Sequence, residues 1–93
     1  MPIPARALLY EPILKILTDR KEHPSWEIED KLAKLFHVTG KERAIPNPNS
    51  PVGVFRNTVA FAFNHLVYTN QIINCGKRKS PDGGYRAIYR LPI

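Results

Sequence analysis

Apolar residues recur at helical spacing along the first part of the chain. In residues 8–18 they fall at i, i+4, i+7 and i+8, which places them on one face of a helix. Pro12 lies within this stretch, so either the regular helix begins at Pro12 or its first turn is kinked there. Residues 19–23 form a polar break. A second helix is expected to begin after Pro24, with Ser25 as its N-cap.

The second helix is expected to have one apolar and one charged face. Its apolar stripe repeats the spacing of the first and consists of Ile28, Leu32, Leu35 and Phe36. Its outer face is expected to be solvated and carries Glu27, Glu29, Asp30, Lys31 and Lys34. After this helix, Thr39 and Glu42 have the spacing of a capping box that opens a short third helix. Prolines at positions 46, 48 and 51 then predict a loop.

Residues 54–69 carry the clearest helical pattern in the sequence. The face that we predict to be buried consists of Phe55, Val59, Ala62, Phe63 and Leu66. The opposite face consists of Asn57, Ala60, Phe61, Asn64 and Tyr68, with Arg56 and Thr58 at its borders.

The pattern changes after Asn70 from helical to alternating. Residues 71–75 are rich in strand formers, residues 76–84 predict a turn with three consecutive cations, and residues 85–91 alternate in polarity. This pattern predicts a β-hairpin with a basic tip. The order of helices followed by a hairpin predicts an α+β, mainly helical fold, a winged helix-turn-helix whose wing is the two-stranded hairpin. We expect residues 1–93 to form a single domain of this kind.

Positive charge is concentrated in the second half of the sequence. The net charge is +6, with about +1 in residues 1–43 and the remainder in residues 44–93. Such asymmetry favours a surface for a polyanion, although a basic surface that serves only solubility has the same composition. The single cysteine, Cys75, excludes a disulfide within the chain, and no stretch predicts a signal peptide or a membrane span. We therefore expect a cytoplasmic location.

Candidate catalytic and metal-binding patterns are weak. The triplet Glu29-Asp30-Lys31 has the letters of a nuclease motif, but it lies on a helix face, where solvated charge is the expected role. The three histidines and Cys75 lack the paired spacing of zinc ligands. The sequence therefore predicts no catalytic residue, no metal site, no cofactor and no small-molecule substrate.

Several short stretches, taken in order, resemble a known family. They are residues 12–17, Glu22-His23, Leu32-Ala33 with Phe36, Thr39 with residues 42–44, Val54-Phe55 with Asn57 and Val59, and residues 88–91. Together they resemble the N-terminal domain of Mrr-type restriction endonucleases. The resemblance implies a winged-helix module that directs a modification-dependent, type IV-like enzyme to duplex, methylated foreign DNA in a prokaryotic cell. It also implies that residues 1–93 are the N-terminal part of a longer protein with a nuclease domain.

Candidate DNA contacts lie on the helix 54–69 and on the hairpin. On the helix, Arg56 can pair with guanine or a phosphate, and the amides of Asn57 and Asn64 suit adenine edges. Thr58 can meet a phosphate or a thymine methyl group, and Asn57 can alternatively cap the helix. Phe61 either is exposed and touches a methyl group on a base, or is buried under residues 39–51. On the hairpin, phosphate contacts are expected from Lys77, Arg78, Lys79 and Arg86.

Two further functions fit the same pattern. The aromatic residues Phe61 and Tyr68 on the outer face of the helix favour a winged helix that binds proteins or forms a homodimer. A free-standing transcriptional regulator is the other alternative. In the main hypothesis the partner is double-stranded DNA, with neither a membrane nor a small molecule involved.

Overall fold

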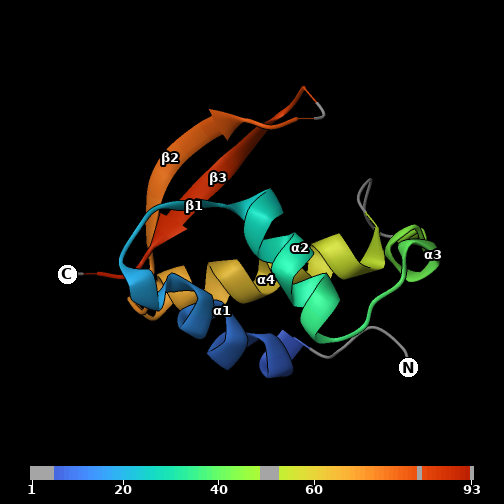
Figure 1. The fold of residues 1–93 in the computed structure, drawn as a ribbon, viewed down its shortest axis with the longest axis horizontal. Coiled ribbons are helices and arrows are strands. Elements are labelled where there is room, and N and C mark those ends of the chain that lie inside the picture. Colours follow the sequence, from blue (N-terminus) through green and yellow to red (C-terminus); the bar gives the residue numbers. More distant parts are fainter. Residues whose placement is uncertain (1–5, 49–52, 82, 93) are drawn as a thin grey trace.

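The computed structural model describes residues 6–48, 53–81 and 83–92 (Figure 1). In chain order the elements are the 3-10 turn η1 (Arg6–Leu9), α1 (Tyr10–Ile16), the 3-10 turn η2 (Leu17–Asp19), β1 (His23–Pro24), α2 (Ser25–Leu35), α3 (Gly40–Arg43), α4 (Val54–Tyr68), β2 (Ile73–Lys79) and β3 (Tyr85–Arg90). This order confirms the predicted α+β, mainly helical, winged-helix-like fold. Within the described residues, no helix is long and apolar enough to cross a membrane.

The first helix begins before its proline. The turn η1 leads into α1 at Tyr10, so Pro12 lies in the first turn of α1. Backbone N–H groups in a first helical turn have no partner within the helix, and a proline there loses no hydrogen bond. The alternative in which regular helix begins at Pro12 is therefore wrong. Leu9, Ile13 and Leu17 are buried, as the stripe predicted.

The helix α2 begins differently from the prediction. Pro24 belongs to the strand β1 and occupies the N-cap position, while Ser25 is already the first helical residue. The Ser25 hydroxyl is buried and forms no hydrogen bond with any described residue. Ser25 is therefore not the N-cap. Ile28 and Leu32 are buried as expected, whereas Leu35 at the end of the helix is exposed.

The predicted capping box at α3 is confirmed. The Glu42 backbone N–H donates to Thr39 Oγ1 at 3.1 Å, and the Thr39 backbone N–H donates to Glu42 Oε1 at 2.9 Å. The chain then returns to the start of α4, where the Val54 N–H donates to the Ile45 carbonyl. A Cβ at Gly53 would lie 2.9 Å from the Arg43 carbonyl oxygen, so this close approach requires glycine.

The helix α4 is the centre of the core. All five residues of its predicted inner face are buried, which confirms that prediction. They pack in one cluster with residues of α1, η2, α2, the segment after α4, and β3, namely Ile13, Leu17, Ile28, Leu32, Ile72 and Tyr89. Figure 1 shows α2 crossing in front of α4, with α1 below them and the hairpin of β2 and β3 rising on the other side.

The sheet has three strands rather than the two that the sequence predicted. Its order is β1-β3-β2, all antiparallel, with His23 opposite Tyr89 and Pro24 opposite Ile88. A two-residue strand has too few positions for an alternating pattern, so the sequence could not reveal β1. Its pairing fixes the base of the hairpin beside the helices.

The hairpin also differs from the prediction in where its turn lies. The strand β2 continues through all three cations, because Lys77, Arg78 and Lys79 pair with Ala87, Arg86 and Tyr85. The described part of the turn is residues 80–81 and 83–84, so the cations lie along the strand β2 and not in the turn at the tip of the hairpin. A bulge between Asn74 and Lys77 contains Gly76, whose φ of 112° is accessible to glycine.

Candidate nucleic-acid interface

The side of α4 that is not buried lies between the turn η1 and the hairpin. On the η1 side, Tyr10 stacks on His65 with ring centres 4.5 Å apart. The Arg6 guanidinium carbon lies 5.9 Å from the centre of the Phe61 ring, within cation–π range. Phe61 is 49% exposed, so the alternative that buried it under residues 39–51 is wrong. The described part of that segment meets α4 at its first turn, through Ile45 and Val54, nearly two helical turns before Phe61.

Polar residues on the same side of α4 are in part engaged within the helix. The Thr58 hydroxyl donates to the Val54 carbonyl at 2.9 Å, so it is partly committed to the helix backbone. Asn57 is not the helix cap, because Gly53 occupies the N-cap position. The Asn57 side chain is half-buried and that of Asn64 is exposed. Both asparagine amides therefore lie at positions from which they can meet a ligand.

Glu29 is buried, which corrects the prediction of a solvated charge on α2. Its side chain is 3% exposed and meets arginines from α3, α4 and β3. Arg43 Nη2 lies 2.6 Å from Glu29 Oε2, while Arg56 Nε and Arg86 Nη2 lie 3.2 Å and 3.9 Å from Oε1. A carboxylate is stable in such a site only because these cations replace the water it loses. Arg56 and Arg86, both predicted as DNA contacts, are thus brought together by a residue that sequence reasoning missed.

Arg43 has a second partner at the surface. Its Nη1 lies 2.9 Å from Asp30 Oδ1. Burial acts against the charged guanidinium, but the hydrogen bonds to Glu29 and Asp30 raise the pKa of Arg43 above its usual value. Arg43 therefore stays charged at neutral pH, where it is the cation with the shortest contact to Glu29.

A cleft of about 170 Å³, here called the wing cleft, separates α4 from the hairpin. Its α4 side includes Arg56, Ala60 and Asn64, and its β3 side includes Tyr85 and Arg86. Ser25, at the start of α2, also lines it. The wing cleft therefore brings together two arginines, an asparagine amide, the Glu29 carboxylate, and the hydroxyl-bearing residues Ser25, Tyr85 and Tyr89.

The cations of β2 are exposed but face two directions. Side chains opposite one another in a ladder share a face of the sheet, so Lys77 and Lys79 lie on the face of Ala87 and Tyr85. That face also lines the wing cleft. Arg78 lies on the other face, and its Nη2 is 3.9 Å from Glu22 Oε1. Lys77 and Lys79 thus lie on the hairpin face of Tyr85 and Ala87, and Arg78 lies on the face of Arg86, which lines the wing cleft as well.

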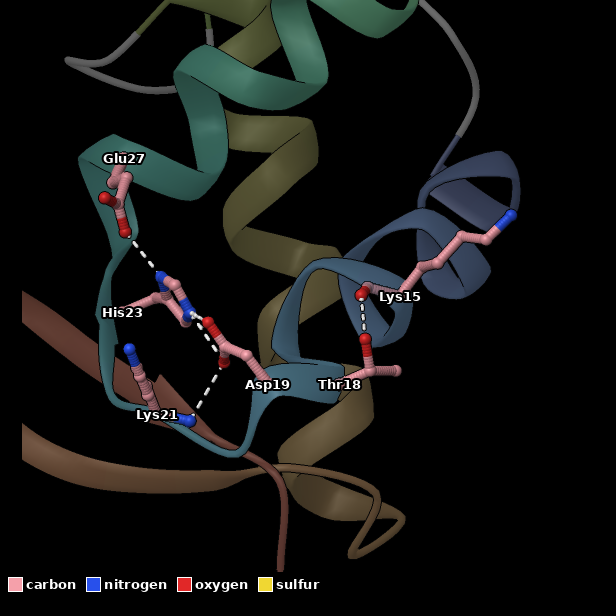
Figure 2. Close-up of polar contacts among 6 residues, drawn as sticks. All are labelled: Lys15, Thr18, Asp19, Lys21, His23 and Glu27. Carbon is pink, nitrogen blue, oxygen red and sulfur yellow. Dashed lines mark hydrogen bonds and ion pairs between the residues drawn. The ribbon is translucent and has the colours of Figure 1, made fainter.

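A histidine with two carboxylate partners supports the base of the hairpin (Figure 2). The His23 side chain in β1 has Nδ1 2.5 Å from Glu27 Oε2 and Nε2 2.9 Å from Asp19 Oδ2. Burial acts against the charged ring, but its hydrogen bonds to Glu27 and Asp19 outweigh this effect and raise the pKa of His23 above 6.5. Only the protonated ring can donate from both nitrogens, so the charged form fits this geometry.

A comparison with known protein families identifies the family to which the chain belongs. The model of the Mrr N-terminal domain matches residues 8–79, from η1 to the end of β2. The chain belongs to the Mrr N-terminal domain family. This confirms the resemblance inferred from the short stretches of sequence. No curated protein matches the chain.

The match indicates the kind of protein in which this Mrr N-terminal domain occurs. The family belongs to restriction-system proteins, and the matched region is their N-terminal accessory domain, distinct from the catalytic nuclease domain. The matched residues include Arg56, Phe61, Asn64 and the cations of β2, whereas β3 with Arg86 follows them. In the part of the chain that the structure describes, no cluster of histidine, cysteine or acidic residues has the arrangement of a metal site.

Proposed function

We propose that this Mrr N-terminal domain binds duplex DNA and thereby directs a restriction enzyme to its target. The observation that carries the proposal is the wing cleft, which has Arg56 on its α4 side and Arg86 on its hairpin side, with the exposed Lys77 and Lys79 on the neighbouring strand β2. Cations on two elements that flank one concave surface suit a polyanion better than a small apolar ligand. Family membership in restriction systems supports the same partner.

In this proposal α4 enters the major groove, which is wide enough for a helix. Asn57 and Asn64 read base edges, and Phe61 touches methyl groups there. Thr58, with its hydroxyl hydrogen-bonded to Val54, presents its methyl group. Lys77, Arg78, Lys79, Arg56 and Arg86 bind phosphates, and they set affinity and its salt dependence more than sequence choice.

Fluorescence anisotropy with a labelled duplex, at low and moderate salt, tests DNA binding. We expect binding at low salt that weakens steeply as salt rises. Reversal of Lys77, Arg78 and Lys79 to Glu should abolish it for all sequences alike. The matched control reverses Lys15, Lys31 and Lys34, which are exposed on α1 and α2 and do not line the wing cleft. If both triple variants lose the same affinity, the location of the interface is wrong.

Methylation is tested with the same assay. The proposal expects tighter binding to an adenine-methylated or cytosine-methylated duplex than to the unmodified one. Replacement of Phe61 by Ala should remove that difference and leave binding to unmodified DNA nearly unchanged. A preference that survives in Phe61→Ala would remove Phe61 from this role.

A protein-binding surface is the second candidate, because Tyr68 is 86% exposed and Phe61 lies on the same helix. It predicts a concentration-dependent dimer in sedimentation experiments, with or without DNA. A monomer that binds DNA at all concentrations would contradict it. The targeting role further predicts that the native reading frame continues into a nuclease domain, whereas a free-standing regulator would not.

A further inference from the structure

We propose that Glu29 is a positioning residue that holds Arg56 and Arg86 as a pair across the wing cleft, where they clamp one backbone phosphate of the bound DNA. The inference rests on the proposed DNA binding and adds to it a site and a residue. Glu29 lines the same cleft but is only 2% exposed, and in this arrangement its carboxylate contacts the two guanidinium groups and not the nucleic acid.

The first argument is the imbalance of charge around Glu29. Three guanidinium groups meet one carboxylate, and Arg43 at 2.6 Å has the shortest contact. Arg56 and Arg86 share the other oxygen at longer distances. Each guanidinium has five N–H donors, so a guanidinium that is positioned by one contact with Glu29 still has donors for a second ligand. The side chain of Arg56 remains 41% exposed, which leaves it accessible to an anion.

The second argument is the Ser25 hydroxyl. It lines the same cleft, it belongs to a residue that is only 5% exposed, and its oxygen has no hydrogen-bond partner among the residues that the structure describes. A buried hydroxyl without a partner is costly and uncommon in folded proteins. A phosphate oxygen held by Arg56 and Arg86 would supply the missing acceptor. The orphaned group therefore points, independently of the charges, to a ligand with an acceptor oxygen.

The third argument is size and position. The cleft volume of about 170 Å³ is below the roughly 300–1,000 Å³ of pockets for small organic ligands, so it suits a single group such as a phosphate. The major and minor grooves of a duplex are separated by one sugar-phosphate strand. With α4 in the major groove and the hairpin at the adjacent minor groove, the cleft between them faces that strand.

The direction in which one substitution changes DNA affinity distinguishes a positioning role of Glu29 from a purely electrostatic one. Replacement of Glu29 by Gln removes a negative charge near a polyanion, so electrostatics alone predicts tighter DNA binding. If Glu29 positions the arginines, affinity should instead fall, by about tenfold for a lost charged hydrogen bond. Asp30→Asn is the matched control, because it removes the same charge from the next residue, which contacts Arg43 alone among the three arginines. It should leave affinity unchanged or raise it.

A scan of the DNA backbone identifies the clamp directly. Single phosphates of a bound duplex are replaced, one at a time, by neutral methylphosphonates. The wild-type domain should lose affinity most at one position. For Glu29→Gln and Arg86→Gln, the methylphosphonate at that position should reduce affinity only slightly, because the clamp of these variants is already impaired. For Arg78→Gln, the same methylphosphonate should reduce affinity as much as it does for the wild type. A purely structural role for Glu29 would lower affinity at all positions without changing this pattern.

The possible outcomes are distinct. Thermal unfolding by circular dichroism establishes which variants are folded, and if Glu29→Gln is not, Arg86→Gln carries the backbone scan alone. Tighter binding by Glu29→Gln, or the same phosphate pattern in the wild type and Arg86→Gln, overturns the clamp while DNA binding stands. Failure of the wild-type domain to bind DNA at low salt overturns the proposed function as well.

Discussion

Phe63 of α4 and Tyr89 of β3 stack with their ring centres 4.4 Å apart and their planes inclined by 24°. This pair joins the helix proposed to read DNA to the base of the hairpin. Both side chains are buried, and Tyr89 also pairs with His23 of β1 across the sheet. The distance between α4 and the hairpin, and with it the width of the wing cleft, is therefore set by the core and not by the exposed residues.

Loss of this stack should destabilise the whole domain. We expect Phe63→Ala to lower the free energy of unfolding by about 3–5 kcal/mol, because it leaves a cavity in the core of a small protein. Tyr68→Ala, on an exposed part of the same helix, should change it by no more than about 0.5 kcal/mol. Urea unfolding followed by circular dichroism measures both. Equal stability of the two variants would contradict the central role of the stack.

The stability of the domain should fall as pH rises past neutrality because of His23. The folded protein raises the pKa of His23 above 6.5, so its stabilising contribution is complete below the unfolded value and is lost as pH rises through the folded one. The free energy of unfolding should therefore be larger at pH 6 than at pH 8. His23→Gln should remove this difference, and His65→Gln, on α4, should keep it. A slope that persists in His23→Gln would assign it to another group.

Asp19, the partner of His23, should control the acid side of the same profile. The backbone N–H of Lys21, followed by the His23 ring, lowers the pKa of Asp19 below its usual value. A carboxylate of this kind stabilises the fold above its unfolded pKa and loses that contribution as pH falls through the lowered one. Asp19→Asn should therefore flatten the loss of stability in acid, measured by urea unfolding between pH 5 and the acid midpoint. The exposed Glu11, replaced by Gln, is the control.

The cations of β2 should contribute unequally to the salt dependence of DNA binding. Lys77 and Lys79 share the face of Tyr85 and Ala87, whereas Arg78 lies on the other face, where the carboxylate of Glu22 partly neutralises its charge. Neutralisation of either lysine should reduce the slope of log affinity against log salt by about 1, and Arg78→Gln should reduce it less. Anisotropy titrations at several salt concentrations give these slopes. Three equal reductions would show that the sheet faces do not matter.

Asn64 and Asn57 should determine sequence preference. Their side chains are accessible on the α4 surface proposed to face the bases. Replacement of either by Ala should cost about 1–3 kcal/mol at a preferred base pair if the amide makes a bidentate contact. Competition among duplexes of different sequence measures this change in preference. Gln71→Ala, an exposed polar residue beyond α4, should leave the preference intact.

Much of the fold was predictable because it depends on neighbours in sequence. The inner face of α4 follows from its helical period, and the capping box at Thr39 and Glu42 involves residues three positions apart. The hairpin follows from alternation next to glycine-rich residues. Three of the short stretches that resemble the Mrr N-terminal domain lie in these same elements, namely Thr39 with residues 42–44, Val54-Phe55 with Asn57 and Val59, and residues 88–91.

The candidate site was only partly predictable, because its geometry depends on residues distant in sequence. The sequence determined which cations and amides exist and which helix carries them. Only the tertiary structure decided that Glu29 is buried, since its three arginines come from α3, α4 and β3. It likewise decided the pairing of β1 with β3 and the exposure of Phe61 beside η1. A helical period indicates that a residue lies on an outer face, but what covers that face is set by the packing of the rest of the chain.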